Sequence, residues 1–219
     1  MASAVTAGSG RFITIEGGDG SGKSTQAALL EESLIAEGLQ VLLTREPGGT
    51  EGAEQIRGLL VEGSTQRWDA WSEALLVYAA RCDHVVRVIT PALAAGRWVI
   101  CDRFVHSTLA YQGHVGGLGE EPIKALHSLA LGRLWPDLVL VLDLPADVGL
   151  ARAAERGGAA RFEARGATFH ESLRQAFLTL ANAEPGRCRL IDATGSREAV
   201  QAKVMQSVRQ SFAFGHKPS

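Results

Sequence analysis

Five short apolar runs are spread along the chain, at residues 12–15, 41–44, 98–101, 138–142 and 189–191. They lack the regular polar alternation that a sheet with one solvent-exposed face would show. The pattern therefore predicts strands that are covered on both faces.

Between these runs, apolar residues recur at helical spacing. The segments with this spacing are residues 24–37, 50–61, 70–95, 121–131, 146–155, 168–183 and 197–212. Strands that alternate with helices predict a parallel sheet with helices on both faces. Right-handed crossovers then bring the carboxyl ends of all strands to one edge, where such folds bind their ligands.

The first predicted strand runs into a glycine-rich loop. Its residues fit the pattern G-x-x-x-x-G-K-[ST] and are Gly17, Gly18, Asp19, Gly20, Ser21, Gly22, Lys23 and Ser24. Between a strand and a helix, such a loop cradles phosphates with its backbone N–H groups. Lys23 then reaches the β- and γ-phosphates, and the Ser24 hydroxyl is a ligand of a nucleotide-bound Mg²⁺. A glycine turn that matches by chance is the alternative, but the flanking elements favour an α/β fold of P-loop NTPase type.

Length, charge and cysteine content limit the classes of protein to which the chain can belong. The chain of 219 residues suits a single domain, expected at residues 11–214, with a disordered tail at residues 1–10. A net charge of -2 argues against a general nucleic-acid binder. Three cysteines without metal-ligand spacing indicate reduced thiols in a cytoplasmic protein, and the absence of a long apolar run argues against a membrane role.

Charged residues follow the second and third predicted strands. Arg45 lies where a guanidinium can bind a phosphate, and a solvated surface arginine is the alternative. Asp102 can orient water ligands of Mg²⁺, and Arg103 beside it can hold a second phosphate. A salt bridge at the end of the strand is the alternative for this pair.

Two segments offer groups that a nucleoside can use. Arg81 follows small residues on the predicted helix 70–95 and can reach a base, although spacing alone favours a surface arginine. Hydroxyl, amide and aromatic groups gather at residues 107–113. This suits a nucleoside, but a capped helix needs the same residue types.

Residues 152–166 combine glycine and alanine with Arg152, Arg156, Arg161 and Arg165. Such a composition is poor core material and indicates a mobile surface segment. Beside a phosphate loop, we expect it to form a lid that neutralises charge during phosphoryl transfer and excludes water. A solvated run of charges is the alternative.

Taken in order, these motifs resemble bacterial thymidylate kinases over nearly all of residues 11–213. The marks are the phosphate loop, TREPGGT at 44–50, YAAR at 78–81, DRF at 102–104, Ser107-Thr108, AYQG at 110–113 and IDAT at 191–194. The resemblance implies a nucleoside monophosphate kinase with a five-stranded parallel sheet, which transfers the γ-phosphoryl of ATP to dTMP. It further implies Mg²⁺ as cofactor and a homodimer, while charge and hydropathy predict no nucleic-acid or membrane partner.

The same resemblance implies the dTMP-binding residues. Arg45 and Arg103 would hold the phosphate, Arg81 would read a thymine carbonyl, and Phe104 would pack beside the sugar. Asp19 would lie near the 3′-hydroxyl. The other implied dTMP-binding positions are Pro47, Val77, Thr108, Tyr111 and Gln112, and the tyrosine is the one that disfavours a 2′-hydroxyl.

For ATP, the resemblance implies binding by the phosphate loop together with Thr25. Arg152 looks like the arginine that stacks on adenine, and Ala193 and Thr194 look like the loop behind that base.

Thymidylate kinases take a catalytic arginine either from the phosphate loop or from the lid. Gly20 occupies the loop position where one class has arginine, so the resemblance assigns this task to the lid, with Arg161 as the first candidate and Arg156 as the second. Val77 stands where the family usually has a phenylalanine stacked on thymine. A valine offers contact area but no π face.

We expect direct in-line transfer without a phosphoenzyme, because the acceptor is already an anionic phosphate oxygen. Lys23, Arg103 and a lid arginine would supply positive charge, and Asp102 would hold the shell of a magnesium ion bound to Ser24. Two alternatives remain at this point. One is a kinase for another small acceptor, and the other is a nucleotide-dependent switch that needs no acceptor.

Overall fold

The computed structural model describes residues 10–155, 161–162 and 164–212. Residues 1–9 of the predicted tail 1–10, and residues 156–160 and 163 of the predicted lid, lie outside the described residues. The strands are β1 (Phe12–Gly17), β2 (Val41–Arg45), β3 (Trp98–Asp102), β4 (Leu138–Asp143) and β5 (Cys188–Asp192). The helices are α1 (Lys23–Ala36), α2 (Glu51–Val61), α3 (Ala70–His84), η1 (Val85–Ile89), α4 (Thr90–Ala94), α5 (Val105–Thr108), η2 (Leu109–Val115), α6 (Glu120–Leu131), α7 (Ala146–Glu155), α8 (Ala167–Ala183) and α9 (Arg197–Ser211).

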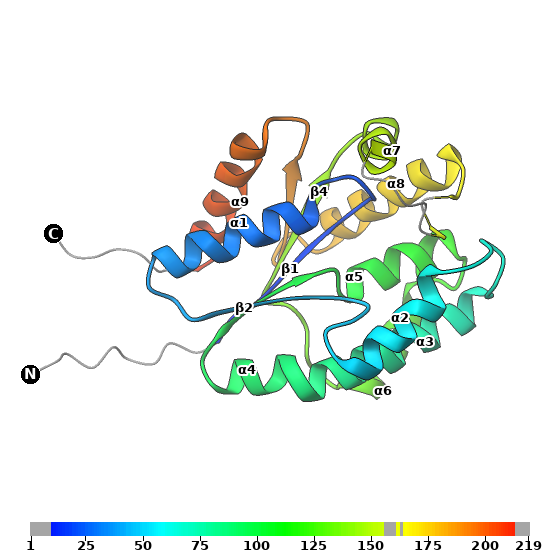
Figure 1. Ribbon diagram of the computed structural model, residues 1–219, viewed down its shortest axis with the longest axis horizontal. Helices are drawn as coiled ribbons and strands as arrows, with labels where there is room; N and C mark the ends of the chain where they lie inside the picture. Colours follow the sequence, from blue (N-terminus) through cyan, green and yellow to red (C-terminus); the bar gives the residue numbers. More distant parts are fainter. Residues whose placement is uncertain (1–9, 156–160, 163, 213–219) are drawn as a thin grey trace, which may run out of the picture.

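The described strands form one parallel five-stranded sheet in the order β2-β3-β1-β4-β5 (Figure 1). This confirms the predicted fold class and all predicted strands, whose observed bounds are one or two residues longer. Ile15 of β1 pairs with Asp102 of β3, and Arg45 of β2 pairs with the same residue. The ends of these strands therefore meet at one edge, as the predicted topology requires.

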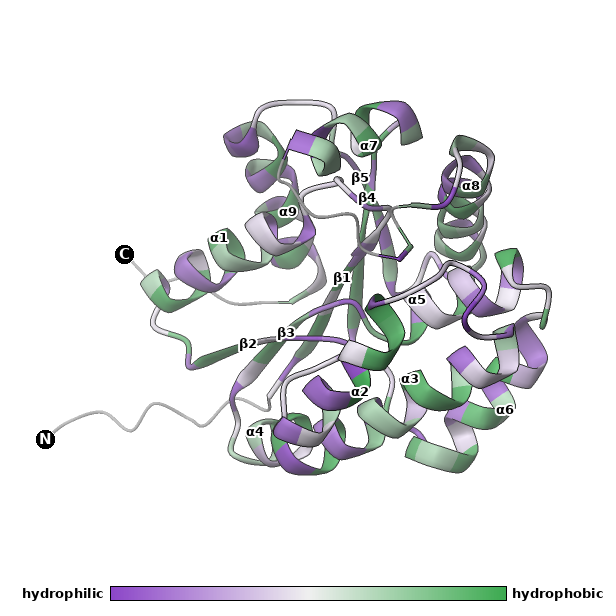
Figure 2. Ribbon diagram, turned by 45° about the vertical axis from the view of Figure 1, so that its right-hand side comes forward, coloured by the Kyte–Doolittle hydropathy of each residue, from purple (hydrophilic) through white to green (hydrophobic). Residues whose placement is uncertain are grey.

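Helices cover the sheet on both faces, and alternate strand residues serve the two layers. Ile13 and Ile15 pack with residues of α1 and α9, whereas Phe12 packs with residues of α3, α5 and α8. The strands are mostly hydrophobic along their length (Figure 2), as expected for strands buried from both sides. Among the described residues, no helix is both long and apolar enough to cross a membrane.

The helices differ from the sequence prediction in two places. The expected helix 70–95 is α3, the π-helical η1 and α4 in succession, with Pro91 in the first turn of α4. Proline has no N–H to donate to the preceding turn, which explains why the α-helical ladder is interrupted just before it. Residues 107–113, for which the sequence left a helix and a nucleoside-binding segment open, lie within α5 and η2.

Candidate active site

The phosphate loop wraps around the amino end of α1. Gly17, Gly20 and Gly22 have φ of 137°, 77° and 90°, a region that favours glycine. Lys23 begins the helix and its Nζ donates to Gly18 O at 2.7 Å. Burial lowers the pKa of Lys23 to about 8, and nearby Arg103 acts in the same direction. A buried cation at a helix amino terminus suits a polyanionic ligand.

Gly20 is fixed by close contact with α7. A Cβ at this position would lie 1.9 Å from the carbonyl oxygen of Gly149, and a Cβ on Gly149 would lie 2.5 Å from the carbonyl oxygen of Asp19. Both glycines are therefore needed for the loop and α7 to touch. An arginine at residue 20 cannot be accommodated without displacing α7, which gives a physical reason for a glycine at the loop position where one class of the family has arginine.

Ser24 and Asp102 are brought together from α1 and β3. The Ser24 hydroxyl donates to Asp102 Oδ2, while Asp102 Oδ1 is buried without a hydrogen-bond partner among the described residues. A hydroxyl and a carboxylate with an unused oxygen are the oxygen donors that Mg²⁺ prefers. The residues present thus fit the metal site that the motif predicted.

Arg103 joins the phosphate loop to the neighbouring pocket. It is a non-glycine residue with φ of 72°, directly after β3. Its Nη1 donates to Gly17 O and to Ser107 Oγ, both at 3.1 Å, and its Nη2 donates to Asp19 Oδ1 at 2.6 Å. Although burial opposes the effect, Arg103 and Lys23 lower the pKa of Asp19. The guanidinium also lies 5.3 Å from the centroid of the Tyr111 ring.

A buried carboxylate holds the turn after Arg103. Glu16, at 0% exposure, accepts hydrogen bonds from Phe104 N at 2.8 Å and from Ser107 Oγ at 2.6 Å. Burial raises the pKa of Glu16. The glutamate thus anchors the DRF turn to β1.

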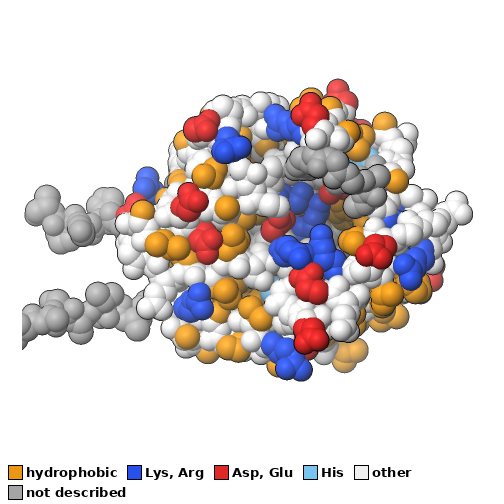
Figure 3. Space-filling model, in the orientation of Figure 1, with side chains coloured by type: hydrophobic (Ala, Val, Ile, Leu, Met, Phe, Trp, Pro, Cys, Tyr) orange, Lys and Arg blue, Asp and Glu red, His pale blue; other side chains and the backbone are white. Residues whose placement is uncertain are grey.

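A pocket opens beside Arg103, and we call it the acceptor pocket. Its lining contains nine of the predicted dTMP-binding residues, namely Asp19, Pro47, Val77, Arg81, Arg103, Phe104, Thr108, Tyr111 and Gln112. The lining also includes residues outside the predicted dTMP-binding positions, namely Glu46, Arg57, Leu60, Val61, Ser107 and Phe162. Lys and Arg side chains gather around a hollow on this face of the molecule (Figure 3).

Arg81 is buried in the pocket wall rather than solvated at the surface. Its Nε donates to Glu46 Oε2 at 2.7 Å, and both side chains are 2% exposed. Glu46 Oε1 contacts His84 Nδ1 at 3.0 Å. The Nη1 of Arg81 is buried without a hydrogen-bond partner among the described residues. An unused donor in a pocket wall is suited to a carbonyl oxygen of a ligand.

Arg45 and Arg57 form a cationic corner next to Pro47. Arg45, predicted to hold a phosphate, is 47% exposed in its side chain, pairs with Glu54 at 2.9 Å and is not in the pocket lining. Arg57 is in the lining and donates to Pro47 O at 2.9 Å. Burial and the adjacent Arg45 lower the pKa of Arg57. Nothing in the sequence pointed to Arg57, which reaches the pocket only through the tertiary packing of α2, chiefly against α3.

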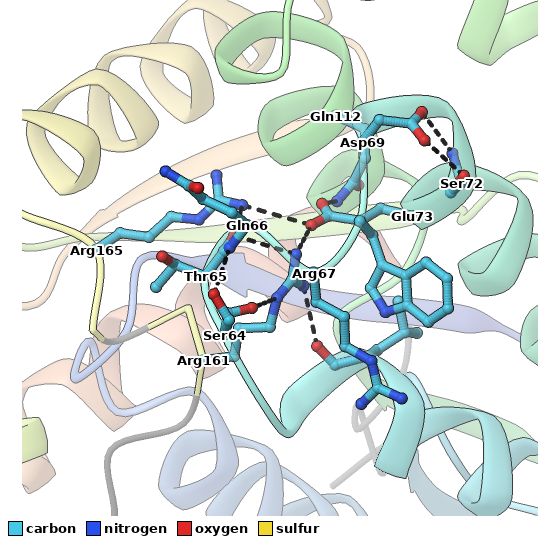
Figure 4. A network of polar contacts seen from close by, with 12 residues as sticks. Ser64, Thr65, Gln66, Arg67, Asp69, Ser72, Glu73, Gln112, Arg161 and Arg165 are labelled. Carbon is cyan, nitrogen blue, oxygen red and sulfur yellow. Dashed lines mark hydrogen bonds and ion pairs between the residues drawn. The ribbon is translucent and has the colours of Figure 1, made fainter.

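The first candidate for the catalytic lid arginine is deeply held. Arg161 is 2% exposed, and its Nε donates to Ser64 O at 2.8 Å. Its Nη2 forms an ion pair with Glu73 (Figure 4). Arg156, the second candidate, lies outside the described residues. In the observed position, Arg161 serves as an anchor for the loop between α2 and α3, so a role at the transferring phosphoryl group would require it to leave these contacts.

The residues predicted near adenine lie around the ends of β4 and β5. Ala193 N donates to Asp143 O at 2.8 Å, and the Thr194 hydroxyl donates to Asp192 Oδ1 at 2.6 Å. Arg152 lies half-buried on α7. The contact with Gly20 sets α7 against the phosphate loop, and β4 and β5 lie on the opposite side of β1 from β2 and β3.

Known proteins resemble this chain along most of its length. A family model described as thymidylate kinase matches residues 15–204. A thymidylate kinase of Caulobacter vibrioides is 54% identical over 201 residues, 92% of this chain and 97% of that protein. One from Pseudomonas syringae pv. tomato is 52% identical over 195 residues, 89% of this chain and 93% of that protein. The crystal structure of thymidylate kinase from Ehrlichia chaffeensis superposes with a TM-score of 0.75 at 34% identity, covering 91% and 98% of the two chains.

Proposed function

The chain belongs to the thymidylate kinase family and phosphorylates dTMP to dTDP, and we propose that the γ-phosphoryl passes directly and in line from ATP to dTMP. The observation that carries this proposal is the position of Arg103. It contacts Gly17 of the phosphate loop and also lines the acceptor pocket, so one cation borders both substrates. The accepting oxygen is already anionic, so positioning and charge neutralisation suffice without a strong base.

ATP is proposed to bind along the phosphate loop and α1. Backbone N–H groups of residues 17–25 would surround the phosphates, with Lys23 at the β- and γ-positions. Arg152, Ala193 and Thr194 would border adenine. This assignment is supported by the fold, since Arg152 lies on α7 and the other two residues directly follow β5.

Ser24 and Asp102 are proposed to hold Mg²⁺, with Asp102 acting through water. The support is the contact between their side chains and the unused Oδ1 of Asp102. Bound there, the ion would neutralise charge on the β- and γ-phosphate oxygens. The chain's own contribution is to set Ser24 at the first turn of α1, next to Lys23.

For dTMP, the acceptor pocket separates a cationic end from a base-binding end. Arg103 and Arg57, with Arg45 nearby, are proposed to hold the phosphate. Arg81 would donate to a carbonyl of the base, with Phe104, Val77, Thr108 and Gln112 around it. Asp19 and Tyr111, joined by a 3.3 Å hydrogen bond, would face the sugar. Val77 gives the base an aliphatic contact.

A lid arginine is proposed to neutralise charge on the transferring phosphoryl group. The contacts of Arg161 with Ser64 and Glu73 favour Arg156 over Arg161 for this task. Arg156 follows α7 directly, and α7 begins against the phosphate loop. This position in the chain supports Arg156 as the catalytic arginine of an enzyme whose phosphate loop has none.

We also propose that the protein is a cytoplasmic homodimer. An apolar stripe runs along one side of α3 into η1, with Trp71, Leu75 and Val86 exposed by 45%, 54% and 69%. Continuous exposed apolar surface of this kind marks an interaction site. A second copy is the proposed occupant, and sedimentation measurements should give the mass of two chains.

An acceptor panel tests the function. With MgATP, dTMP should give the highest kcat/KM among dTMP, dUMP, dCMP and thymidine, and ADP should appear only when an acceptor is present. Faster turnover of dCMP or thymidine would contradict the substrate assignment. Rapid release of ADP without any acceptor would indicate a nucleotide-hydrolysing switch instead.

A further inference from the structure

We propose that Glu73 is a positioning residue for substrate selection, which fixes the orientation of the Gln112 amide in the acceptor pocket and links it to Arg161. The inference rests on the proposed function, because it concerns how the pocket distinguishes the base of dTMP from other bases. Glu73 lies in the first turn of α3, is 4% exposed and does not line the pocket itself. It therefore acts through its neighbours.

The two carboxylate oxygens of Glu73 have separate partners (Figure 4). Oε2 accepts a hydrogen bond from Gln112 Nε2 at 3.0 Å. Oε1 accepts from Nη2 of Arg161, and from Nη2 of Arg165 at 3.4 Å. An ionised carboxylate only accepts hydrogen bonds, so every group that faces it must donate. One buried anion thus connects η2 with two arginines at the carboxyl-terminal end of the predicted lid.

This connection also shapes the pocket wall. The backbone N–H of Arg161 donates to Val61 O at 2.9 Å and its Nη1 donates to Leu60 O at 3.1 Å, at the end of α2. A cation is favourable at a helix carboxyl terminus. The next residue, Phe162, lines the acceptor pocket and packs edge-on to Tyr111 with ring centroids 5.4 Å apart. The carboxylate that anchors Arg161 therefore also anchors a wall of the pocket.

The contact with Glu73 decides which atom Gln112 offers to a ligand. Because Nε2 is directed to the carboxylate, the carbonyl oxygen Oε1 is the end of the amide on the pocket side. An acceptor there matches a ring N–H, as in thymine. It opposes the unprotonated ring nitrogen of cytosine, which is itself an acceptor. Hydrogen-bond mismatches of this kind give strong discrimination in buried sites.

Substitution Glu73→Gln inverts this polarity while nearly preserving shape. The guanidinium of Arg161 would donate its hydrogen bond to the oxygen of the new amide, because a charged donor makes the stronger hydrogen bond. The new NH₂ would then face Gln112, whose amide would have to turn and present its own NH₂ to the pocket. We expect kcat/KM for dTMP to fall about tenfold or more, mainly through KM, and the ratio of dTMP to dCMP turnover to fall by at least about tenfold.

A purely structural role would lower turnover of both substrates by the same factor, and an unchanged dTMP to dCMP ratio in a folded Glu73→Gln protein would overturn the inference. In a Gln112→Leu background, Glu73→Gln should leave the ratio unaltered, because the amide it acts through is gone. A further decrease in the dTMP to dCMP ratio in that background would also contradict the mechanism.

If Glu73→Gln does not fold, Glu73→Asp is the substitute variant. It keeps the negative charge that pairs with Arg161, but its shorter side chain moves the carboxylate away from Gln112. A lowered ratio supports the inference and an unchanged ratio overturns it. Wild-type protein that fails to use dTMP would instead refute the proposed function. The two failures are therefore distinguishable.

Discussion

The phosphate loop and the acceptor pocket lie side by side, yet they are built in different ways. The loop consists of consecutive residues, and its shape comes from glycines with left-handed backbone and from the start of α1. The pocket collects side chains from distant elements and fixes them with buried carboxylates, namely Glu16, Glu46 and Glu73. A binding site made of backbone can be recognised from a short motif, whereas one made of paired side chains depends on the whole fold.

The predicted lid, which we propose to act on both regions, gives the largest expected effect. Arg156→Ala should lower kcat by about 10³-fold with a small change in ATP affinity, as expected for loss of an arginine that contacts the transferring group. Arg161→Ala should instead raise KM for dTMP and lower thermal stability, because Arg161 anchors the pocket wall through Glu73.

Steady-state kinetics and ATP titration of both variants check this assignment. The opposite pattern, with Arg161→Ala defective in kcat alone and normal in stability, would return the catalytic role to Arg161. It would also show that the observed contacts of Arg161 break during turnover.

Buried pairing in the pocket predicts the next largest effect. Glu46→Gln leaves the guanidinium of Arg81 buried without its counter-ion, and should lower the free energy of unfolding by about 3 kcal/mol. Glu54→Gln is a matched control, because it removes a carboxylate from Arg45 in a pair that is 47% and 42% exposed. It should cost less than about 1 kcal/mol. Denaturant unfolding measures the stability of both variants. Equal losses would contradict the expectation that buried ion pairs hold the acceptor pocket together.

On the donor side, backbone geometry should matter more than charge. Gly20→Ala places a Cβ at a left-handed position and 1.9 Å from Gly149 O, so we expect a loss of about 2 kcal/mol in unfolding free energy. Gly18→Ala is the control within the same loop, because a Cβ there meets nothing within 4 Å. Similar stabilities of the two variants in the absence of nucleotide would show that contact with α7 does not constrain the loop.

Counted per pH unit, the smallest effect concerns acid stability behind the pocket. Burial lowers the pKa of His127 to about 4, and its Nε2 lies 2.7 Å from Leu134 O. In the unfolded chain the His127 imidazole is protonated below about pH 6.5, whereas in the folded protein it is protonated only below about pH 4. Stability should therefore fall as pH drops through this window, by up to about 1.4 kcal/mol per pH unit from this group.

In His127→Gln, unfolding free energies measured from pH 7 to pH 4 should fall less steeply than in wild type. Equal slopes would mean that His127 is not the group that titrates. The ring lies 6.0 Å from the Phe104 ring, so this test reports on the acceptor side of the molecule.

Residues that follow a strand directly were the easiest to place from sequence. Asp102 and Arg103 were expected at the ligand edge, and the structure brings both there. Arg57 was missed because its neighbours in sequence carry no sign of a pocket. Phe162 was missed although it follows Arg161, because only the fold places its ring against Tyr111. Arg161 was singled out for its charge, but charge alone does not distinguish an arginine that meets a substrate from one that anchors a loop.

The sequence by itself determined the five strands, their parallel arrangement and the phosphate loop, because apolar runs and glycine positions act through local backbone geometry. Only the tertiary structure decided which side chains are paired. Glu46 meets Arg81 across 35 residues, Glu73 meets Gln112 across 39, and Arg161 meets Glu73 across 88. Such contacts depend on how helices pack over the sheet edge, and a charged residue in a linear sequence gives no record of its partner.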